Sequence, residues 1–233
     1  MNTTAGTREP SAARLMLTLG LAGMLSGLII VIAFEASLPS ITAYKAAQLR
    51  TAVFAVLPGS TRIQIIVFRG GRLSASNQDD QDNESIYAGY DSEGRLVGYA
   101  IPAEGSGFQD TIRLLYGYLP KQRTVVGMEI LDSRETPGLG DKIYKDAAFV
   151  ANFQSLIIRH GIVAVKKGRK STSNEVDTIT GATISSKAVV QIINQANKRW
   201  APRLSLPEMD AAISSKTHSR LNNRISKEIH GSI

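Results

Sequence analysis

A run of twenty residues without a charged side chain, from Leu15 to Phe34, constrains the fold of this chain more than any other feature. Twenty helical residues at about 1.5 Å each extend about 30 Å, which is the hydrocarbon thickness of a bilayer. A helix also satisfies its own backbone hydrogen bonds in lipid, which an irregular segment cannot do. Because Arg14 and Glu35 bound the run, the sequence predicts a transmembrane helix over residues 15–34.

A cleaved secretory signal peptide is the alternative interpretation of this run. Such a peptide has a shorter apolar core, of about 7–15 residues, followed by a small-x-small cleavage site. The segment Ala33-Phe34-Glu35-Ala36 does not have that spacing, so an uncleaved anchor is favoured. Arg8 and Arg14 precede the run more closely than Lys45 and Arg50 follow it. The positive-inside rule therefore predicts a cytoplasmic N-terminus, residues 1–14, and a domain outside the cytoplasm.

Composition excludes several kinds of site. The chain has no cysteine, which rules out disulfides, thiolate metal sites, iron–sulfur ligation and cysteine nucleophiles. Its three histidines lack the spacing of metal ligands. The formal charge of +7 invites a nucleic-acid interpretation. From Lys198 to Ile233 there are seven Lys and Arg residues against three Asp and Glu residues, so about four units of the excess lie at the C-terminal end of the chain. The polar, basic C-terminal tail, residues 201–233, has no interleaved aromatic residues, so we expect no nucleic-acid partner.

Hydrophobic periodicity predicts an α+β domain over residues 35–200, in which helices pack around an antiparallel sheet. The hairpin segment Asp91-Ser92-Glu93-Gly94 joins two of its strands, and Gly70–Glu84 is expected to be a polar surface loop. An apolar stripe at helical spacing marks the last helix. The predicted strands are 62–69, 85–90, 95–101, 111–118 and 124–131, and the predicted helices are 40–56, 145–153 and 184–200.

The segment Asp177–Ser186, which reads DTITGATISS, is the most unusual part of the domain. Gly181 and Ala182 leave the backbone open just before Thr183, which stands at the start of the last predicted helix. Free amides and the positive end of the helix dipole make such a place a seat for a phosphate. The plainer interpretation is an N-cap, in which the hydroxyl of Thr183 or Ser185 accepts a backbone hydrogen bond.

The pattern Asp-x-x-Thr-Gly-Ala-Thr in this segment resembles the flavinylation motif of the FMN-binding domain family. In that family the final threonine forms a phosphoester with FMN, which a separate Mg²⁺-dependent flavin transferase installs from FAD. The resemblance implies covalent FMN on Thr183. It implies that the surrounding recognition motif consists of Asp177, Thr180, Gly181 and Ala182.

A second segment agrees with this resemblance. The run Glu-Thr-Pro-Gly-Leu-Gly at residues 135–140 resembles a hallmark of the electron-transport members of the family. By itself it would be a Pro-Gly turn. The resemblance implies that the wall around the flavin ring includes Glu135, Thr136, Gly138 and Leu139.

The layout of one N-terminal helix followed by this domain resembles the G subunit of Rnf-type ion-translocating oxidoreductase complexes. That resemblance implies an electron carrier without a complete active site of its own, whose partners are other membrane subunits. It also implies a single-pass protein of the bacterial inner membrane with its domain on the periplasmic side. The C subunit of a sodium-translocating NADH:quinone reductase and a cofactor-free, membrane-anchored binding module remain as alternatives.

Overall fold

The computed structural model describes residues 11–76 and 84–204, and its first element is one long helix. Helix α1 runs from Ala12 to Val56 and passes through Pro39 without a break. The predicted start of a second helix at residue 40 is therefore wrong. Proline removes only one backbone donor of the helix, and the helix continues on both sides of it. The predicted end at Val56 is confirmed.

The chain divides into two compact units, residues 1–48 and residues 49–233. Helix α1 is long and apolar enough to cross a membrane, with a mean hydropathy of 2.4 over its most apolar window, none of which is buried. The last turns of α1, from Leu49 onward, belong to the second unit. This unit is the folded domain.

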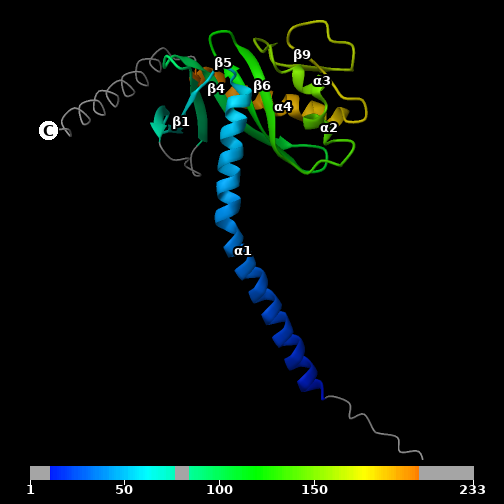
Figure 1. The fold of residues 1–233 in the computed structure, drawn as a ribbon. Helices are drawn as coiled ribbons and strands as arrows, with labels where there is room; N and C mark the ends of the chain where they lie inside the picture. The colour runs from blue at the N-terminus through cyan, green and yellow to red at the C-terminus, as the bar shows by residue number, and fades with distance from the viewer. Residues whose placement is uncertain (1–10, 77–83, 205–233) are drawn as a thin grey trace, which may run out of the picture. The chain divides into compact units, whose positions relative to one another are not determined.

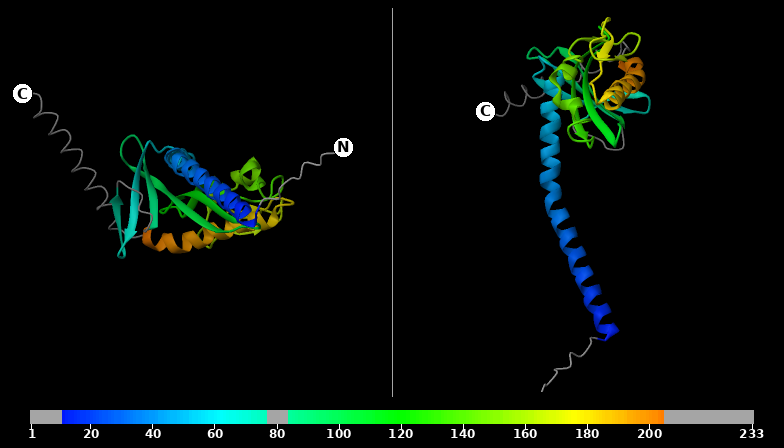
Figure 2. Two further views of the ribbon diagram at one scale, coloured as in Figure 1. Left: turned by 90° about the horizontal axis from the view of Figure 1, so that it is seen from below. Right: turned by 90° about the vertical axis from the view of Figure 1, so that its right-hand side faces the viewer.

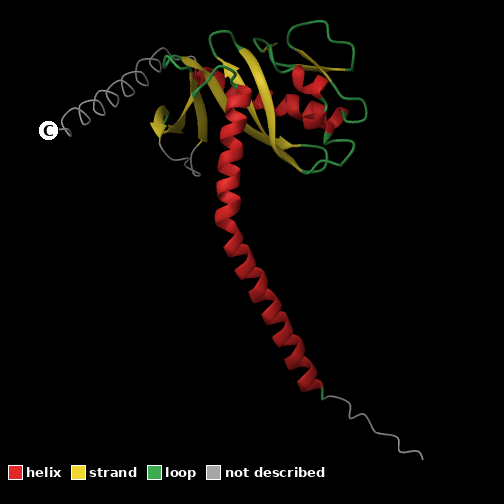
Figure 3. Ribbon diagram, in the orientation of Figure 1, coloured by secondary structure: helices red, strands yellow, loops and turns green. Residues whose placement is uncertain are grey.

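A seven-stranded antiparallel sheet forms the centre of the domain (Figures 1 and 3), in the order β2-β1-β3-β4-β5-β6-β7. Its strands are β1 (Arg62–Arg69), β2 (Arg72–Ser76), β3 (Glu84–Tyr90), β4 (Leu96–Ser106), β5 (Thr111–Leu119), β6 (Thr124–Ser133) and β7 (Leu156–Ile157). Two short parallel strands, β8 (Val163–Val165) and β9 (Glu175–Asp177), pair separately. The remaining helices are α2 (Lys142–Lys145), α3 (Ala147–Ala151) and α4 (Thr183–Leu204). The predicted α+β class is confirmed.

Each face of the sheet has its own core, because successive residues of a strand point to opposite faces. Along β5, Leu114 and Tyr116 belong to the larger core, whereas Leu115 between them belongs to the smaller one. Helix α4, which lies along one face (Figure 2), closes the larger core with residues such as Val189 and Trp200. The end of α1 closes the smaller core with residues Ala52, Val53 and Val56.

Three sequence predictions need correction. The polar segment 70–84 is not all loop, since β2 pairs with β1 across the two-residue turn Gly70-Gly71. The predicted helix 145–153 is two short helices, because the Asp146 side chain accepts hydrogen bonds from Ala148 and Phe149 and so starts α3 anew. Helix α4 continues to Leu204 rather than ending at residue 200. The rest of the predicted tail, residues 205–233, lies outside the described residues, as do residues 1–10.

The added turn of α4 is held by a basic side chain. The Arg203 guanidinium lies 3.9 Å from the centre of the Phe68 ring and 5.1 Å from that of Trp200. It also forms an ion pair with Glu84. These contacts compensate for Pro202 inside the helix, where proline cannot donate a backbone hydrogen bond.

Candidate functional site

Thr183 is the first residue of α4, and its side chain is exposed. Its hydroxyl has one long contact, a donated hydrogen bond of 3.4 Å to the carbonyl of Ile179. The N-cap interpretation fails, because in the described part of the chain no helix amide donates to Thr183 or Ser185. Ser186 holds the turn instead, accepting from the amide of Ile179 and donating to the carbonyl of Ala182. The hydroxyl oxygen of Thr183 is therefore open to solvent and accessible for esterification.

Gly181 sets the path of the chain into α4. Its φ of +84° lies in the left-handed region that L side chains rarely adopt. A Cβ placed there would meet nothing nearer than Leu139 Cδ2, at 3.8 Å. The space above the turn is therefore open, and backbone conformation rather than crowding requires glycine. The next residue, Ala182, is buried under the helix.

Glu135 joins three segments that are distant in the sequence. It is buried, and its Oε1 accepts hydrogen bonds from the amides of Phe108 (2.8 Å) and Gln109 (3.0 Å). Its Oε2 accepts a bond of 2.6 Å from the hydroxyl of Ser185. One carboxylate thus connects the β4–β5 loop, the β6–α2 loop and the first turn of α4.

The β6–α2 loop, residues 134–141, also touches the start of α4 directly. Leu139 approaches Gly181, and the backbone of Gly140 packs against the side chains of Glu135 and Ser185. Gly138 occupies the turn with a φ of +78°, and the Thr136 hydroxyl donates to Gln109 Oε1 at 2.8 Å. The loop and the helix start, some forty residues apart in sequence, therefore form one surface. The role of this loop in holding a ring stays a prediction.

Four large apolar side chains are exposed on the β4–β5 loop, the β6–α2 loop, the first turn of α4 and α2. They are Phe108 (64% exposed), Ile184 (58%), Leu139 (50%) and Tyr144 (45%). Exposed apolar side chains that gather on one surface are typical of ligand or partner contact. Sequence analysis named Leu139 among them and did not name Phe108, Ile184 or Tyr144.

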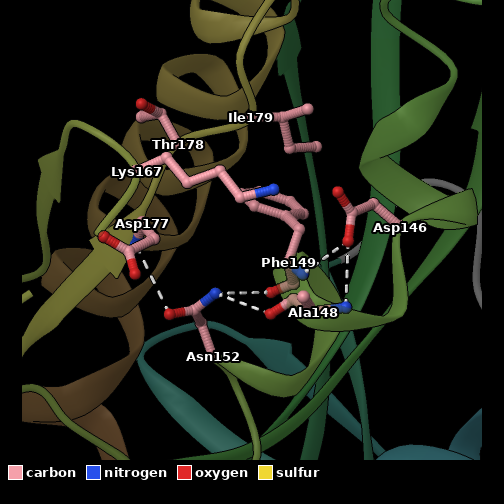
Figure 4. Close-up of a pocket in the computed structure, with 8 residues that line it drawn as sticks. All are labelled: Asp146, Ala148, Phe149, Asn152, Lys167, Asp177, Thr178 and Ile179. Atoms are coloured by element: carbon pink, nitrogen blue, oxygen red, sulfur yellow. Dashed lines mark hydrogen bonds between the residues drawn. The ribbon is translucent and has the colours of Figure 1, made fainter.

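Asp177 lies at the end of β9, where it lines a small cavity of about 100 Å³ (Figure 4). Its carboxylate accepts a bond from the amide of Arg169 at 3.3 Å, and its own amide donates to Asn152 at 3.3 Å. Ligand pockets enclose about 300–1,000 Å³, so this cavity is too small for a flavin. Asp177 thus fastens the β8–β9 connection, while Thr180 is exposed in the turn that follows.

Asp141 is a buried acid that sequence analysis did not single out. Its carboxylate forms a 2.6 Å ion pair with Lys145. This ion pair, together with the nearby amide of Gly138, holds the pKa of Asp141 below its usual range. The only sequence indication was its position directly after the Gly-Leu-Gly run. Ser186 was likewise missed, and Ser185, which sequence analysis considered as an N-cap acceptor, instead donates to Glu135.

A family model for the FMN-binding domain matches residues 107–198, which include both the Glu135 loop and the start of α4. All the site contacts of Glu135 and Thr183 described above fall inside the matched residues.

Curated proteins that this chain resembles have similar names. The G subunit of an ion-translocating oxidoreductase complex from Methanosarcina acetivorans is 35% identical over 126 residues, covering 53% of this chain and 63% of that protein. The G subunit of a Na⁺-translocating ferredoxin:NAD⁺ oxidoreductase complex from Acetobacterium woodii is 35% identical over 112 residues, covering 48% and 52%. The matches thus span between about half and somewhat under two thirds of these relatives' length.

Solved structures share the fold. NqrC from Shewanella oneidensis superposes with a TM-score of 0.56 at 17% identity, over 70% of this chain and 98% of that one. The C subunit of the Na⁺-translocating NADH-quinone reductase from Parabacteroides distasonis gives a TM-score of 0.51 at 20% identity, over 63% and 79%. At these identities the likeness establishes the architecture of the domain and nothing more.

Proposed function

We propose that this chain is a membrane-anchored electron carrier that holds one FMN covalently through Thr183, as the G subunit of an Rnf-type ion-translocating complex. The observation that carries the proposal is the exposed hydroxyl of Thr183 at the first position of α4. It stands at the end of an Asp-x-x-Thr-Gly-Ala-Thr motif within an FMN-binding domain. The names of the curated relatives support the assignment to the G subunit.

The residues around Thr183 suit a flavin phosphate. The first amides of a helix have no partner inside it, and the helix dipole favours an anion there. In the described residues no helix amide donates to the Thr183 hydroxyl, and Ser186 instead bonds back to Ile179 and Ala182 in the preceding turn, which leaves Thr183 free to carry the ester. The open space above Gly181 would admit the phosphate, and Asp177, Thr180 and Ala182 would complete the motif that the flavin transferase recognises.

The ring of the flavin would lie against the β6–α2 loop. Leu139 offers an exposed apolar side chain next to Gly181. Glu135, Thr136 and Gly138 would hold the backbone of this loop against α4. The bound flavin supplies one-electron and two-electron transfer, while the protein supplies position and electrostatics.

We further propose that residues 15–34 span the membrane and that the flavin domain, expected over residues 35–200, is the folded unit that begins at Leu49. The domain would face the periplasm, and its partners would be the other membrane subunits of the complex. A tethered, covalently held cofactor cannot be lost to the outer compartment, which is the physical advantage of both attachments.

The C subunit of a sodium-translocating quinone reductase is the other assignment that the fold permits. The solved structures of that protein resemble this domain at only 17% and 20% identity, whereas the curated relatives named as G subunits reach 35%. Sequence similarity therefore favours the G subunit.

The mass of the intact protein tests the proposal. The chain is purified from a host that expresses a flavin transferase and from one that lacks it. We expect the first preparation to be heavier by one FMN less one water and to give a fluorescent band on a denaturing gel. A colourless protein of unmodified mass from both hosts would favour a cofactor-free binding module instead.

A further inference from the structure

A strongly basic turn connects β8 and β9. Positions 166–170 read Lys-Lys-Gly-Arg-Lys, and all five residues are exposed. The wider segment 159–187 carries six Lys and Arg residues against two Asp and Glu residues. Sequence analysis assigned the excess charge of the chain to its C-terminal tail and left this turn without a role.

The turn is tied to the motif that precedes Thr183. Val165, just before the turn, pairs with Asp177 and accepts a hydrogen bond of 2.8 Å from the amide of Thr178. Inside the turn, the amide of Arg169 donates to the carbonyl of Lys166 at 2.9 Å and to the Asp177 carboxylate at 3.3 Å. The basic residues are therefore attached to the first residues of the flavinylation motif.

A short path leads from the basic turn to the attachment residue. In Figure 4 the side chain of Lys167 lies across the small cavity that Asp177, Thr178 and Ile179 also line. The carbonyl of Ile179 in turn accepts the hydrogen bond from the Thr183 hydroxyl. The cations thus stand next to the site that would carry the flavin.

The acids near this turn are already engaged with the backbone. Asp146 caps α3, Asp177 accepts from Arg169, and Glu175 accepts from the amides of Ser171 and Thr172. Lys170 reaches the neutral oxygen of Asn152, at 3.4 Å. These acids keep their charge, but the four cations of the turn, at positions 166, 167, 169 and 170, outnumber the three acids by one, so the net charge is positive.

Exposed apolar side chains belong to the segments around Thr183 as well, namely Phe108, Leu139 and Ile184. Protein interfaces combine an apolar centre with a polar or charged rim, and charged rims set the rate and choice of partner more than its affinity. We propose that the redox partner of this chain docks at the flavin site through an acidic surface that the basic turn, residues 166–170, attracts. This inference rests on the proposed flavin at Thr183.

Electron transfer to small charged acceptors measures the sign of the field at the flavin. The full chain is purified in neutral detergent, its flavin is verified on a denaturing gel, and the reduced protein is mixed with ferricyanide, a trianion, or hexaammineruthenium(III), a trication. Raising the ionic strength from about 0.01 M to about 0.1 M shortens the Debye length from about 30 Å to about 10 Å. We expect the ferricyanide rate to fall about threefold or more and the ruthenium rate to rise.

Matched variants locate the charge. The double variant Lys166→Gln/Lys167→Gln should lose most of both salt dependences. The control Arg62→Gln/Arg72→Gln removes the same charge from β1 and β2, at the far edge of the sheet, and should behave as wild type. Poly-L-glutamate, as an acidic macromolecular probe, should slow ferricyanide oxidation of the wild type and the control but not of the Lys variant.

Equal salt dependences in all three flavin-bearing proteins would overturn the inference while leaving the proposed function intact. The inference would also be overturned if poly-L-glutamate did not slow ferricyanide oxidation of the wild-type protein, or if poly-L-lysine slowed it instead. A chain that carries no flavin at all would overturn the proposed function and this inference with it.

Discussion

At the scale of single residues, three hydroxyl side chains in the first turn of α4 have different tasks. Ser186 bonds back to the preceding turn, at the amide of Ile179 and the carbonyl of Ala182. Ser185 donates to Glu135, and Thr183 has only a long contact to a carbonyl. A threonine that caps a helix could not be esterified without loss of the cap. Because no amide of the described residues donates to the Thr183 hydroxyl, its modification need not disturb the helix.

The Thr183→Ala substitution should abolish covalent flavin and leave stability within about 0.5 kcal/mol of wild type, since the residue is exposed. Fluorescence of the denatured band measures attachment. Thr172→Ala removes another exposed threonine of the domain and should retain the fluorescent band. A fluorescent Thr183→Ala band would show that the flavin is attached elsewhere.

Glu135 is where loss of one side chain should cost most. Glu135→Ala leaves the amides of Phe108 and Gln109 and the Ser185 hydroxyl without their acceptor, which should lower the free energy of unfolding by about 3 kcal/mol. Glu135→Gln keeps one oxygen for the two amides and should cost about 1 kcal/mol. Chemical denaturation distinguishes the two. Equal, small losses in both variants would mean that the carboxylate does not hold the loops together.

Removing the charge of Glu135 should also make the flavin easier to reduce, because a nearby negative charge disfavours the anionic reduced form. We expect a higher reduction potential in Glu135→Gln and a lower one in Leu139→Asp, which adds a charge next to Gly181. Both variants should still attach flavin. Potentiometric titration, followed by the visible spectrum of the flavin, measures the shifts in reduction potential. Wild-type potentials in both variants would mean that the loop is a turn without influence on the flavin.

At the scale of elements, a groove of glycines in the sheet receives the end of α1. Gly117 of β5 and Gly127 of β6 stand opposite each other, and both lie against the backbone of Val56. Leu57 packs in the same way over Gly89 and Gly98, which pair across β3 and β4. Any side chain in this groove would separate the helix from the smaller core.

The substitution Gly117→Ala should be strongly destabilising, because its Cβ would overlap the carbonyl oxygen of Val56. Backbone cannot move aside as a flexible side chain can, so we expect a loss of about 3 kcal/mol or failure to fold. Thr111→Ala, at an exposed position of the same strand, should cost less than about 0.5 kcal/mol. Thermal melts of both variants test this, and a Gly117→Ala protein as stable as the control would mean that α1 is not seated there.

At the scale of the whole molecule, one continuous helix belongs to two units. Its first part is apolar and exposed, while its last turns are buried in the domain. Exposure of so many apolar side chains is unfavourable in water and favourable in lipid. The domain therefore begins inside the helix, near Leu49, rather than after it.

We expect residues 15–34 to stay uncleaved and the domain to lie outside the cytoplasm. N-terminal sequencing of the mature protein and reporter fusions after residue 60 test the two statements separately. An alkaline phosphatase fusion should be active and a fluorescent protein fusion dark. A mature chain beginning near Ser37, or the reverse reporter pattern, would contradict the prediction.

The sequence by itself determined the features that depend on neighbouring residues. The uncharged run, the Asp91–Gly94 hairpin and the stripe of α4 each follow from a short-range pattern of polarity or turn residues, and the structure has a helix, a strand pair and a helix at these places. The motif around Thr183 is likewise contiguous, so it could be read directly from the chain.

Only the tertiary structure decided the contacts between distant segments. Glu135 meets Ser185 fifty residues away, and Arg203 meets Glu84 across 119 residues. Strands of two or three residues such as β7, β8 and β9 have no periodicity of their own and form only where a partner is already in place. For the same reason the extension of α4 past Pro202 and the basic turn beside Thr183 could not be foreseen. In each case the stabilising energy comes from a partner that local sequence does not contain.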